Sequence, residues 1–335
     1  MQVRRDVRLA DLTTLAVGGP IERLVEVADA TELVAAVREA DEAGTPLLLL
    51  GGGSNIVAPD EGWPGDVVLV RSRGIERDGD SLVVQAGHDW DELVAHTVAN
   101  ELAGMEALSG IPGSTGATPI QNVGAYGQEV AQTITAVRIY DRVEKAERVL
   151  TPAECGFAYR DSRLKRDPAR FVVLEVTFGL HAGRMSRPVG YAELARTLGV
   201  GIGEPAPLAD VREAVIGLRR GKGMVWDPAE PDSRSAGSFF TNPIVPSHQA
   251  VEGCPSWPAG DGRVKLSAAW LVQHAGFGRG TRDGRVGTSS KHSLALTTEE
   301  GATAAELLAF AGRVIATVEE QFGVTLEREP TAVRP

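Results

Sequence analysis

The residues that could do chemistry gather first in a glycine-rich stretch, residues 109–127, with the sequence SGIPGSTGATPIQNVGAYG. Gly110, Gly113 and Gly116 permit positive φ values and two prolines restrict the chain, so we expect a fixed loop rather than a helix or a regular strand. Such a loop presents several peptide N–H groups to an anion. A long turn without a ligand is the alternative, but loops of more than about 12 residues inside compact domains are usually functional or disordered. The interspersed apolar residues argue against disorder.

A second glycine loop supports this interpretation. The apolar run Leu47–Leu50 stops at the sequence GGGSN, residues 51–55, which predicts a buried strand that leads into a phosphate-binding turn. Two loops would suit two phosphates. Neither the G-x-G-x-x-G fingerprint nor the P-loop fits, because no convincing helix opens after Asn55 and no Gly-Lys-Ser or Gly-Lys-Thr follows the loop.

The segments that must position these loops predict short strands and capped helices. Thr31 is expected to cap a helix that ends at Gly44, and Asp89 to cap another. We place the main domain linker at Gly199–Pro207, where the composition shifts. The other expected elements are strands at residues 23–28, 47–50, 67–70, 82–85, 134–140, 171–180 and 324–326, and helices at 151–154, near 211–218, at 267–274 and at 303–322.

Composition limits the classes of partner. The 335 residues include 45 acidic and 34 basic side chains, a net charge of −11, which argues against nucleic acid and acidic membranes as partners. Cys155 and Cys254 and the six histidines show no metal-ligand spacing, so we expect free thiols and no metal. No apolar run approaches the roughly 18 residues that a membrane span needs. We therefore expect a cytoplasmic protein, and we expect it to act as a monomer.

Five motifs in a fixed order resemble the UDP-N-acetylenolpyruvoylglucosamine reductases, the MurB family of bacterial cell-wall synthesis. They are GGGSN at Gly51, the stretch from Ser109, YRDSR at Tyr159, AGSFFTNP at Ala236 and LEREP at Leu326. The resemblance covers nearly the whole chain. It implies an α+β fold, with an FAD-binding domain of the vanillyl-alcohol oxidase type at residues 1–200, made of two α+β subdomains at about 1–70 and 71–200. An α+β substrate-binding domain would occupy residues 205–335, and its C-terminal tail would return to the active site.

The resemblance also implies cofactors and a reaction. FAD would be bound without a covalent bond, NADPH would donate hydride, and UDP-N-acetylglucosamine enolpyruvate would be reduced to UDP-N-acetylmuramate for peptidoglycan synthesis. The absence of His and Cys from both glycine loops agrees with noncovalent binding. The residues expected to bind FAD are Gly51, Gly52, Gly53, Ser54, Asn55, Gly110, Ile111, Pro112, Gly113, Ser114, Gly116, Ala117, Asn122, Gly124 and Ala125.

Three residues match the family's catalytic groups. The resemblance implies that Arg160 faces the substrate carboxylate, Ser238 gives a proton to the carbanionic carbon, and Glu329 assists enolate stabilisation as a protonated acid. A planar guanidinium suits bidentate binding of a carboxylate. A serine hydroxyl is a weak acid and would need charged neighbours to act as a proton donor.

Each of these assignments has an alternative. Arg160 could form a structural ion pair with Asp161 or Glu175, and Ser238 could cap a turn. Glu327 lies two residues before Glu329, and on a strand both would point the same way, so the residues alone do not separate them.

The resemblance further implies substrate contacts by Tyr126, Tyr159, Tyr191, Lys222, Gly237 and Asn242, where Tyr191 matches a substrate-capping loop of the longer MurB subtype. The chain departs from the family at Leu294, where many members have an amide, and at Gly278-Arg279, where a lysine is usual. Two rival functions remain open: an FAD-dependent alcohol or sugar oxidase of the same fold, and a flavin-binding protein without turnover.

Overall fold

The computed structural model describes residues 1–334, and the chain forms two compact units. Unit 1 comprises residues 1–6, 21–52 and 63–220, and unit 2 comprises residues 7–20, 53–62 and the chain from Gly221 onward. Each unit therefore joins segments that are distant in sequence. The functional division expected at residues 200–205 stays a prediction.

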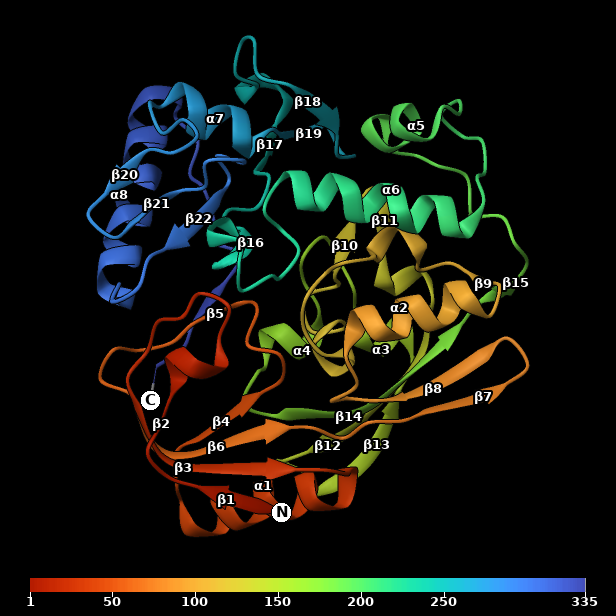
Figure 1. Ribbon diagram of the computed structural model, residues 1–335, viewed down its shortest axis with the longest axis vertical. Helices are drawn as coiled ribbons and strands as arrows, with labels where there is room; N and C mark the ends of the chain where they lie inside the picture. The colour runs from red at the N-terminus through yellow and green to blue at the C-terminus, as the bar shows by residue number, and fades with distance from the viewer. Residues whose placement is uncertain (335) are drawn as a thin grey trace. The chain divides into compact units, whose positions relative to one another are not determined.

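The first sheet of unit 1 leads into the GGGSN loop. Its strand order is β1 (Gln2–Arg4), β3 (Pro20–Val27), β6 (Trp63–Val70) and β4 (Leu47–Leu50), and both β3 and β4 run parallel to β6. Helix α1 (Ala30–Ala43) packs against this sheet, as Figure 1 shows below β3. The expected cap at Thr31 is wrong, because the Asp29 carboxylate accepts the N–H of Glu32; Gly44 ends the helix with a φ of 64°, as predicted.

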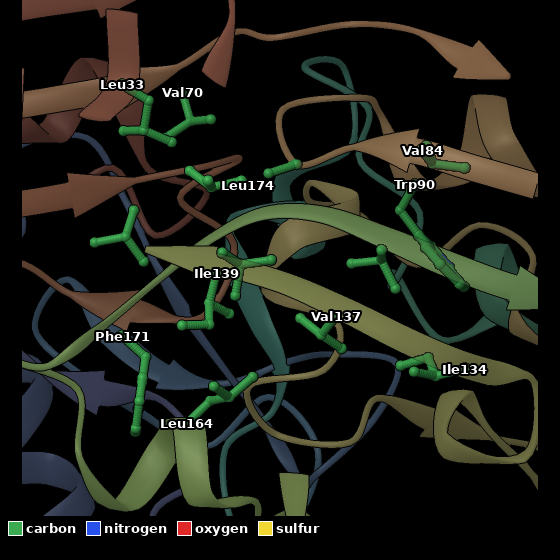
Figure 2. Packing of buried hydrophobic residues seen from close by; sticks show 14 of the residues in the cluster. Leu33, Val70, Val84, Trp90, Ile134, Val137, Ile139, Leu164, Phe171 and Leu174 are labelled. Atoms are coloured by element: carbon green, nitrogen blue, oxygen red, sulfur yellow. The ribbon is translucent and has the colours of Figure 1, made fainter. Parts of the chain in front are cut away.

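The second sheet of unit 1 is antiparallel. It contains β13 (Ala146–Leu150), β12 (Ile134–Asp141), β14 (Phe171–Gly179), β8 (Ser81–Gln85) and β7 (Ile75–Asp78), in that order. Side chains from both sheets form one hydrophobic core with residues of α1 and α2 (Trp90–Ala99). Figure 2 shows part of this core, with Val70, Val84, Ile139 and Leu174 from the strands, Leu33 from α1 and Trp90 from α2. Burial of this apolar surface supplies the main driving force for folding unit 1.

Smaller elements of unit 1 surround the glycine-rich stretch. Helix α6 (Leu208–Gly221) buries Val211 and Val215 in a satellite core with residues of α5 (Ala192–Leu198). The expected linker at 199–207 lies within unit 1, where the N–H of Val189 donates to the carbonyl of Glu204. The remaining elements are α3 (Pro152–Cys155), α4 (Arg163–Arg166), β9 (Leu102–Ala103), β10 (Gly124–Ala125), β11 (Gln128–Glu129) and β15 (His181–Ala182).

Unit 2 is built on a four-stranded sheet of β16 (Ser235–Ser238), β22 (Ala295–Thr298), β21 (Val286–Thr288) and β20 (Arg282–Asp283). The long helix α8 (Ala304–Phe322) packs on β21 and β22, beside α7 (Ala268–His274), and both helices are blue in Figure 1. Both helices were predicted from the sequence; in the structure Thr303 caps α8 and Ser267 caps α7. The other strands are β2 (Val7–Arg8), β5 (Ile56–Val57), β17 (Ile244–Pro246), β18 (Ser256–Pro258), β19 (Arg263–Leu266) and β23 (Thr331–Ala332).

The segment after α8 differs from the prediction. Residues 324–326 do not form a strand; instead Val324 and Leu326 are buried in the core of unit 2, and a single bridge joins Arg328 to Phe240. The prediction failed because a short irregular segment that buries every second side chain has the same alternating sequence pattern as a strand. None of the helices within residues 1–334 combines the length and the apolar character that crossing a membrane requires.

Candidate active site

The two glycine loops meet in unit 1. A Cβ atom on Gly52 would lie 2.6 Å from the Cα of Gly113, and one on Gly51 would lie 2.2 Å from the Oγ of Ser114. The stretch from Gly113 is anchored on α2 and the residues before it, since the N–H of Trp90 donates to the Gly113 carbonyl at 3.1 Å. The structure thus brings together two segments that the sequence separates by about sixty residues.

Gly110 opens the second loop in the left-handed conformation, with a φ of 70°. Its N–H donates to the Asp91 carboxylate at 2.6 Å, and its carbonyl accepts a hydrogen bond of 3.0 Å from the guanidinium of Arg219. Arg219 is only 9 % exposed, and this burial lowers the pKa of its guanidinium. A buried cation therefore lies at the loop that the sequence predicts to bind phosphate.

These loops fit a flavin dinucleotide. A pyrophosphate needs close approach to main-chain N–H groups, and Gly51, Gly52 and Gly113 have no side chain to obstruct it. Gly53 has a φ of 62° and belongs to unit 2, together with Ser54 and Asn55. In the described part of the chain, no group of three or more His, Cys, Asp and Glu side chains could hold a metal ion.

Arg160 is held by the main chain of its own unit. Its guanidinium donates to the carbonyl oxygens of Asn122, at 3.3 Å, and of Gly124, and its Cζ lies 5.4 Å from the centre of the Tyr159 ring. Asp161 and Glu175 are the two acidic residues with which Arg160 could form a structural ion pair. In the structure, Asp161 pairs with Arg166 and Glu175 pairs with Arg138. Arg160 also has a φ of 54°, and backbone strain of this kind is frequent at functional sites.

The hairpin of β10 and β11 presents Tyr126 at its turn, with a φ of 48°. The Tyr126 ring meets the Tyr191 ring edge to face, with centroids 5.4 Å apart. Burial raises the pKa of Tyr126 to about 12, and burial also raises the pKa of Tyr191. Both phenols therefore stay neutral near pH 7 and can donate hydrogen bonds. The structure brings these two predicted substrate residues into contact.

The predicted residues of unit 2 gather around the end of β16. Ser238 is its last residue, and the next residue, Phe239, accepts the N–H of Glu329 at 2.9 Å. The side-chain amide of Asn55 donates to the Glu329 carbonyl at 3.4 Å. Glu329 is half-buried, whereas Glu327 is exposed, so the two carboxylates have different environments.

Other predicted residues of unit 2 have structural contacts. The Asn242 Oδ1 accepts the first N–H of α7, from Ala268, at 2.9 Å. Gly237 has a φ of 69°, which favours glycine at that position. Leu294 is 7 % exposed in the core of unit 2, so this departure from the family pattern is a packing residue. Lys222 directly follows α6 and is half-buried.

Comparisons with known proteins agree with this arrangement. A family model for an FAD binding domain matches residues 21–149, and one for the C-terminal domain of UDP-N-acetylenolpyruvoylglucosamine reductase matches residues 227–333. The UDP-N-acetylenolpyruvoylglucosamine reductase of Thermobifida fusca is 53% identical over 98% of this chain and 97% of its own length. The chain belongs to the UDP-N-acetylenolpyruvoylglucosamine reductase family.

Further members of this reductase family support the assignment. The Streptomyces coelicolor reductase is 51% identical over 99% of this chain and 91% of its own length. The crystal structure of the Thermus caldophilus enzyme (MurB) matches the whole of both chains with a TM-score of 0.71 and 27% sequence identity. The predictions of the family, the fold class, the cofactor FAD and an oxidoreductase of peptidoglycan synthesis are therefore confirmed.

Sequence reasoning missed two residues that this reductase places at its glycine loop. Asp91 and Arg219 both bind Gly110, from α2 and α6. Neither lies in a motif, and each reads as an ordinary charged residue of an amphipathic helix. The only sequence signal for Arg219 is its place among the apolar positions of α6, next to Leu218 and four residues after Val215.

Proposed function

We propose that this chain reduces UDP-N-acetylglucosamine enolpyruvate to UDP-N-acetylmuramate, with NADPH as hydride donor and noncovalently bound FAD. The observation that carries this proposal is the meeting of two glycine loops, at Gly52 and Gly113, in a chain of the reductase family. Neither loop contains a His or Cys that could form a flavin tether. When bound, FAD supplies the hydride transfer from NADPH to the methylene carbon of the enolpyruvyl group.

Arg160 is proposed to bind the substrate carboxylate. Hydride addition to the methylene carbon places electron density on the adjacent carbon and on that carboxylate, and a fixed guanidinium stabilises this charge. The hydrogen bonds to the carbonyls of Asn122 and Gly124 fix the guanidinium before the substrate binds.

Ser238 is proposed to donate the proton that completes the reduction. One hydride and one proton together convert the vinyl carbons into the lactyl group of the product. Ser238 lies where β16 ends, and Gly237 before it has a φ of 69°, a conformation that restricts how the hydroxyl is presented. Removal of the hydroxyl should therefore block proton delivery without disturbing the glycine loops of unit 1.

Glu329 is proposed to assist at the developing enolate as a protonated acid. Glu329 is half-buried, its main-chain N–H donates to the Phe239 carbonyl, and its carbonyl accepts from the Asn55 side chain. These features support the choice of Glu329 over the exposed Glu327. We propose substrate contacts for Tyr126, Tyr159, Tyr191, Lys222, Gly237 and Asn242. A monomeric state and a cytoplasmic location stay predictions.

The proposal is tested by separating the two half-reactions. Under anaerobic conditions, NADPH should bleach the absorbance of the bound flavin, and UDP-N-acetylglucosamine enolpyruvate should restore it with formation of UDP-N-acetylmuramate. An oxidase would instead need oxygen to restore the absorbance, and a flavin-binding protein without turnover would show no steady consumption of NADPH. Bleaching without recovery on addition of the enolpyruvyl substrate would refute the proposal.

A further inference from the structure

Two helices of unit 1 hold the main chain of Gly110 from both sides. Asp91 of α2 accepts its N–H at 2.6 Å, and Arg219 of α6 donates to its carbonyl at 3.0 Å. Gly110 also has a positive φ of 70°. Both peptide groups next to its Cα are therefore fixed by charged side chains, and charge-assisted hydrogen bonds are about twice as strong as neutral ones.

A second charged residue of α6 fixes Asp91. The guanidinium of Arg212 donates to Oδ1 of Asp91 at 2.6 Å and to its Oδ2 at 2.8 Å, a bidentate pair. The two side chains are 19 % and 35 % exposed, so solvent screens the pair less than a fully exposed one. Burial raises the pKa of the Asp91 carboxyl, but hydrogen bonds from Arg212 and Gly110 outweigh this effect and hold the pKa below its ordinary value.

Helix α2 also contains Glu92, whose ion pair with Arg73 lies away from the glycine-rich stretch. Arg73 and Glu92 pair at 2.9 Å, with side chains that are 55 % and 58 % exposed. Among the described residues, neither of these side chains hydrogen-bonds to the glycine-rich stretch. Asp91 and Glu92 are adjacent in sequence, so this pair provides a matched control for loss of one carboxylate charge from α2.

We propose that Asp91 and Arg212 are positioning residues for the FAD loop, which act through Gly110. The pair sets the orientation of the peptide N–H of Gly110, and three residues later Gly113 lies against Gly52 of the other loop. The pair thus orders the phosphate-binding main chain before FAD arrives, and binding then costs less conformational entropy. The inference rests on FAD binding, and it does not depend on the identity of the sugar substrate.

The test compares Asp91→Asn, Arg212→Gln and the double variant with Glu92→Gln in the full-length protein. FAD is titrated into the apoprotein and the dissociation constant is read from flavin fluorescence, while thermal unfolding of the apoprotein is measured separately. We expect the dissociation constant to rise about 10- to 100-fold in each single variant, and to change less than about twofold in Glu92→Gln. The double variant should bind about as weakly as the weaker single variant, because the two residues act as one unit.

A structural role would lower the unfolding temperature of the apoprotein and leave FAD affinity at the level of the control, which would overturn the inference. Additive losses of affinity in the double variant would also overturn it, because the residues would then act separately. If the Asp91 variants do not fold, Arg212→Lys replaces them, since it keeps the charge but loses the bidentate geometry. It should raise the dissociation constant by less than Arg212→Gln, and an unchanged constant would refute the proposal. Failure of the enolpyruvyl substrate to reoxidise the flavin would not affect this result.

Discussion

Gly52 lies so close to Gly113 that a Cβ atom on Gly52 would come within 2.6 Å of the Gly113 Cα. Real Cβ atoms do not approach a main-chain carbon this closely, so at least one loop must shift when Gly52 carries a side chain. Two stretches with little regular secondary structure thus define each other's position. The fit is backbone against backbone, which explains why both loops need glycine.

The first prediction concerns Gly52→Ala. We expect FAD affinity to fall by more than about tenfold, because the shift of either loop removes peptide N–H groups from the pyrophosphate. Gly217→Ala is the control, since Gly217 lies in α6 with nothing within 4 Å of an added Cβ. That change should leave FAD affinity unaltered and stabilise the helix by about 1 kcal/mol. Native FAD affinity in Gly52→Ala, measured by titration of the apoprotein, would show that the contact between the loops is dispensable.

The second prediction separates proton donation from flavin reduction. In Ser238→Ala, NADPH should reduce the flavin at a near-normal rate, whereas reoxidation by the enolpyruvyl substrate should slow by about 10²- to 10⁴-fold, the usual contribution of a general acid. Stopped-flow absorbance measures both steps. Ser247→Ala is the control, because Ser247 is an exposed serine of unit 2 whose hydroxyl, within residues 1–334, donates only to the main-chain carbonyl of Gly262. Equal losses in both half-reactions would identify Ser238 as a structural serine.

The third prediction addresses the guanidinium of Arg160. Arg160→Lys keeps the positive charge but loses the planar donor group that bonds the carbonyls of Asn122 and Gly124. We expect reoxidation by the substrate to slow by about 10²-fold and flavin reduction to change little. Arg166→Lys, at the exposed pair with Asp161, serves as the control and should change neither rate more than about twofold. A near-native second half-reaction in Arg160→Lys would leave Arg160 without a catalytic role.

The fourth prediction follows from the half-buried phenol of Tyr126. Burial raises its pKa to about 12, whereas tyrosine in an unfolded chain has a pKa of about 10. The folded state therefore favours the neutral phenol, so the contribution of Tyr126 to stability is complete below about pH 10 and is lost as the pH rises toward about 12. The near-ultraviolet absorbance of tyrosinate, taken as the difference between wild type and Tyr126→Phe, should show this high midpoint. A midpoint near 10 in that difference would mean that Tyr126 is exposed to solvent.

Local signals in the sequence predicted much of the fold. Asp89 and Thr151 cap helices as expected, because a capping side chain and the N–H it binds are three residues apart. Glycine-rich composition likewise predicted that residues 51–55 and the stretch from Gly110 form loops, whereas their binding of FAD stays a prediction. The cap at Thr31 was wrong because Asp29, two residues earlier, is the stronger competitor for the same helix.

Contacts between distant segments could not be predicted in this way. The sequence gives no means to pair Gly52 with Gly113, or Asp91 with Arg212, because each contact depends on how whole elements pack. Residues 324–326 alternate between apolar and polar side chains because Val324 and Leu326 enter the core of unit 2. Within residues 1–334, no strand pairs with this segment, so it does not form part of a sheet. The roles of Arg160, Ser238 and Glu329 came from the family resemblance, and they stay predictions until the half-reactions are measured.

The parallel pairing of β5 with β23 has a consequence for biosynthesis. A ribosome completes β5 early, but its partner is made only after α8, so this strand pair of unit 2 cannot form until translation has passed Ala332. Every segment of unit 1 has left the ribosome by then, because that unit ends at Arg220. A nascent chain that stalls before β23 would therefore leave Ile56 and Val57 of β5 without this strand partner.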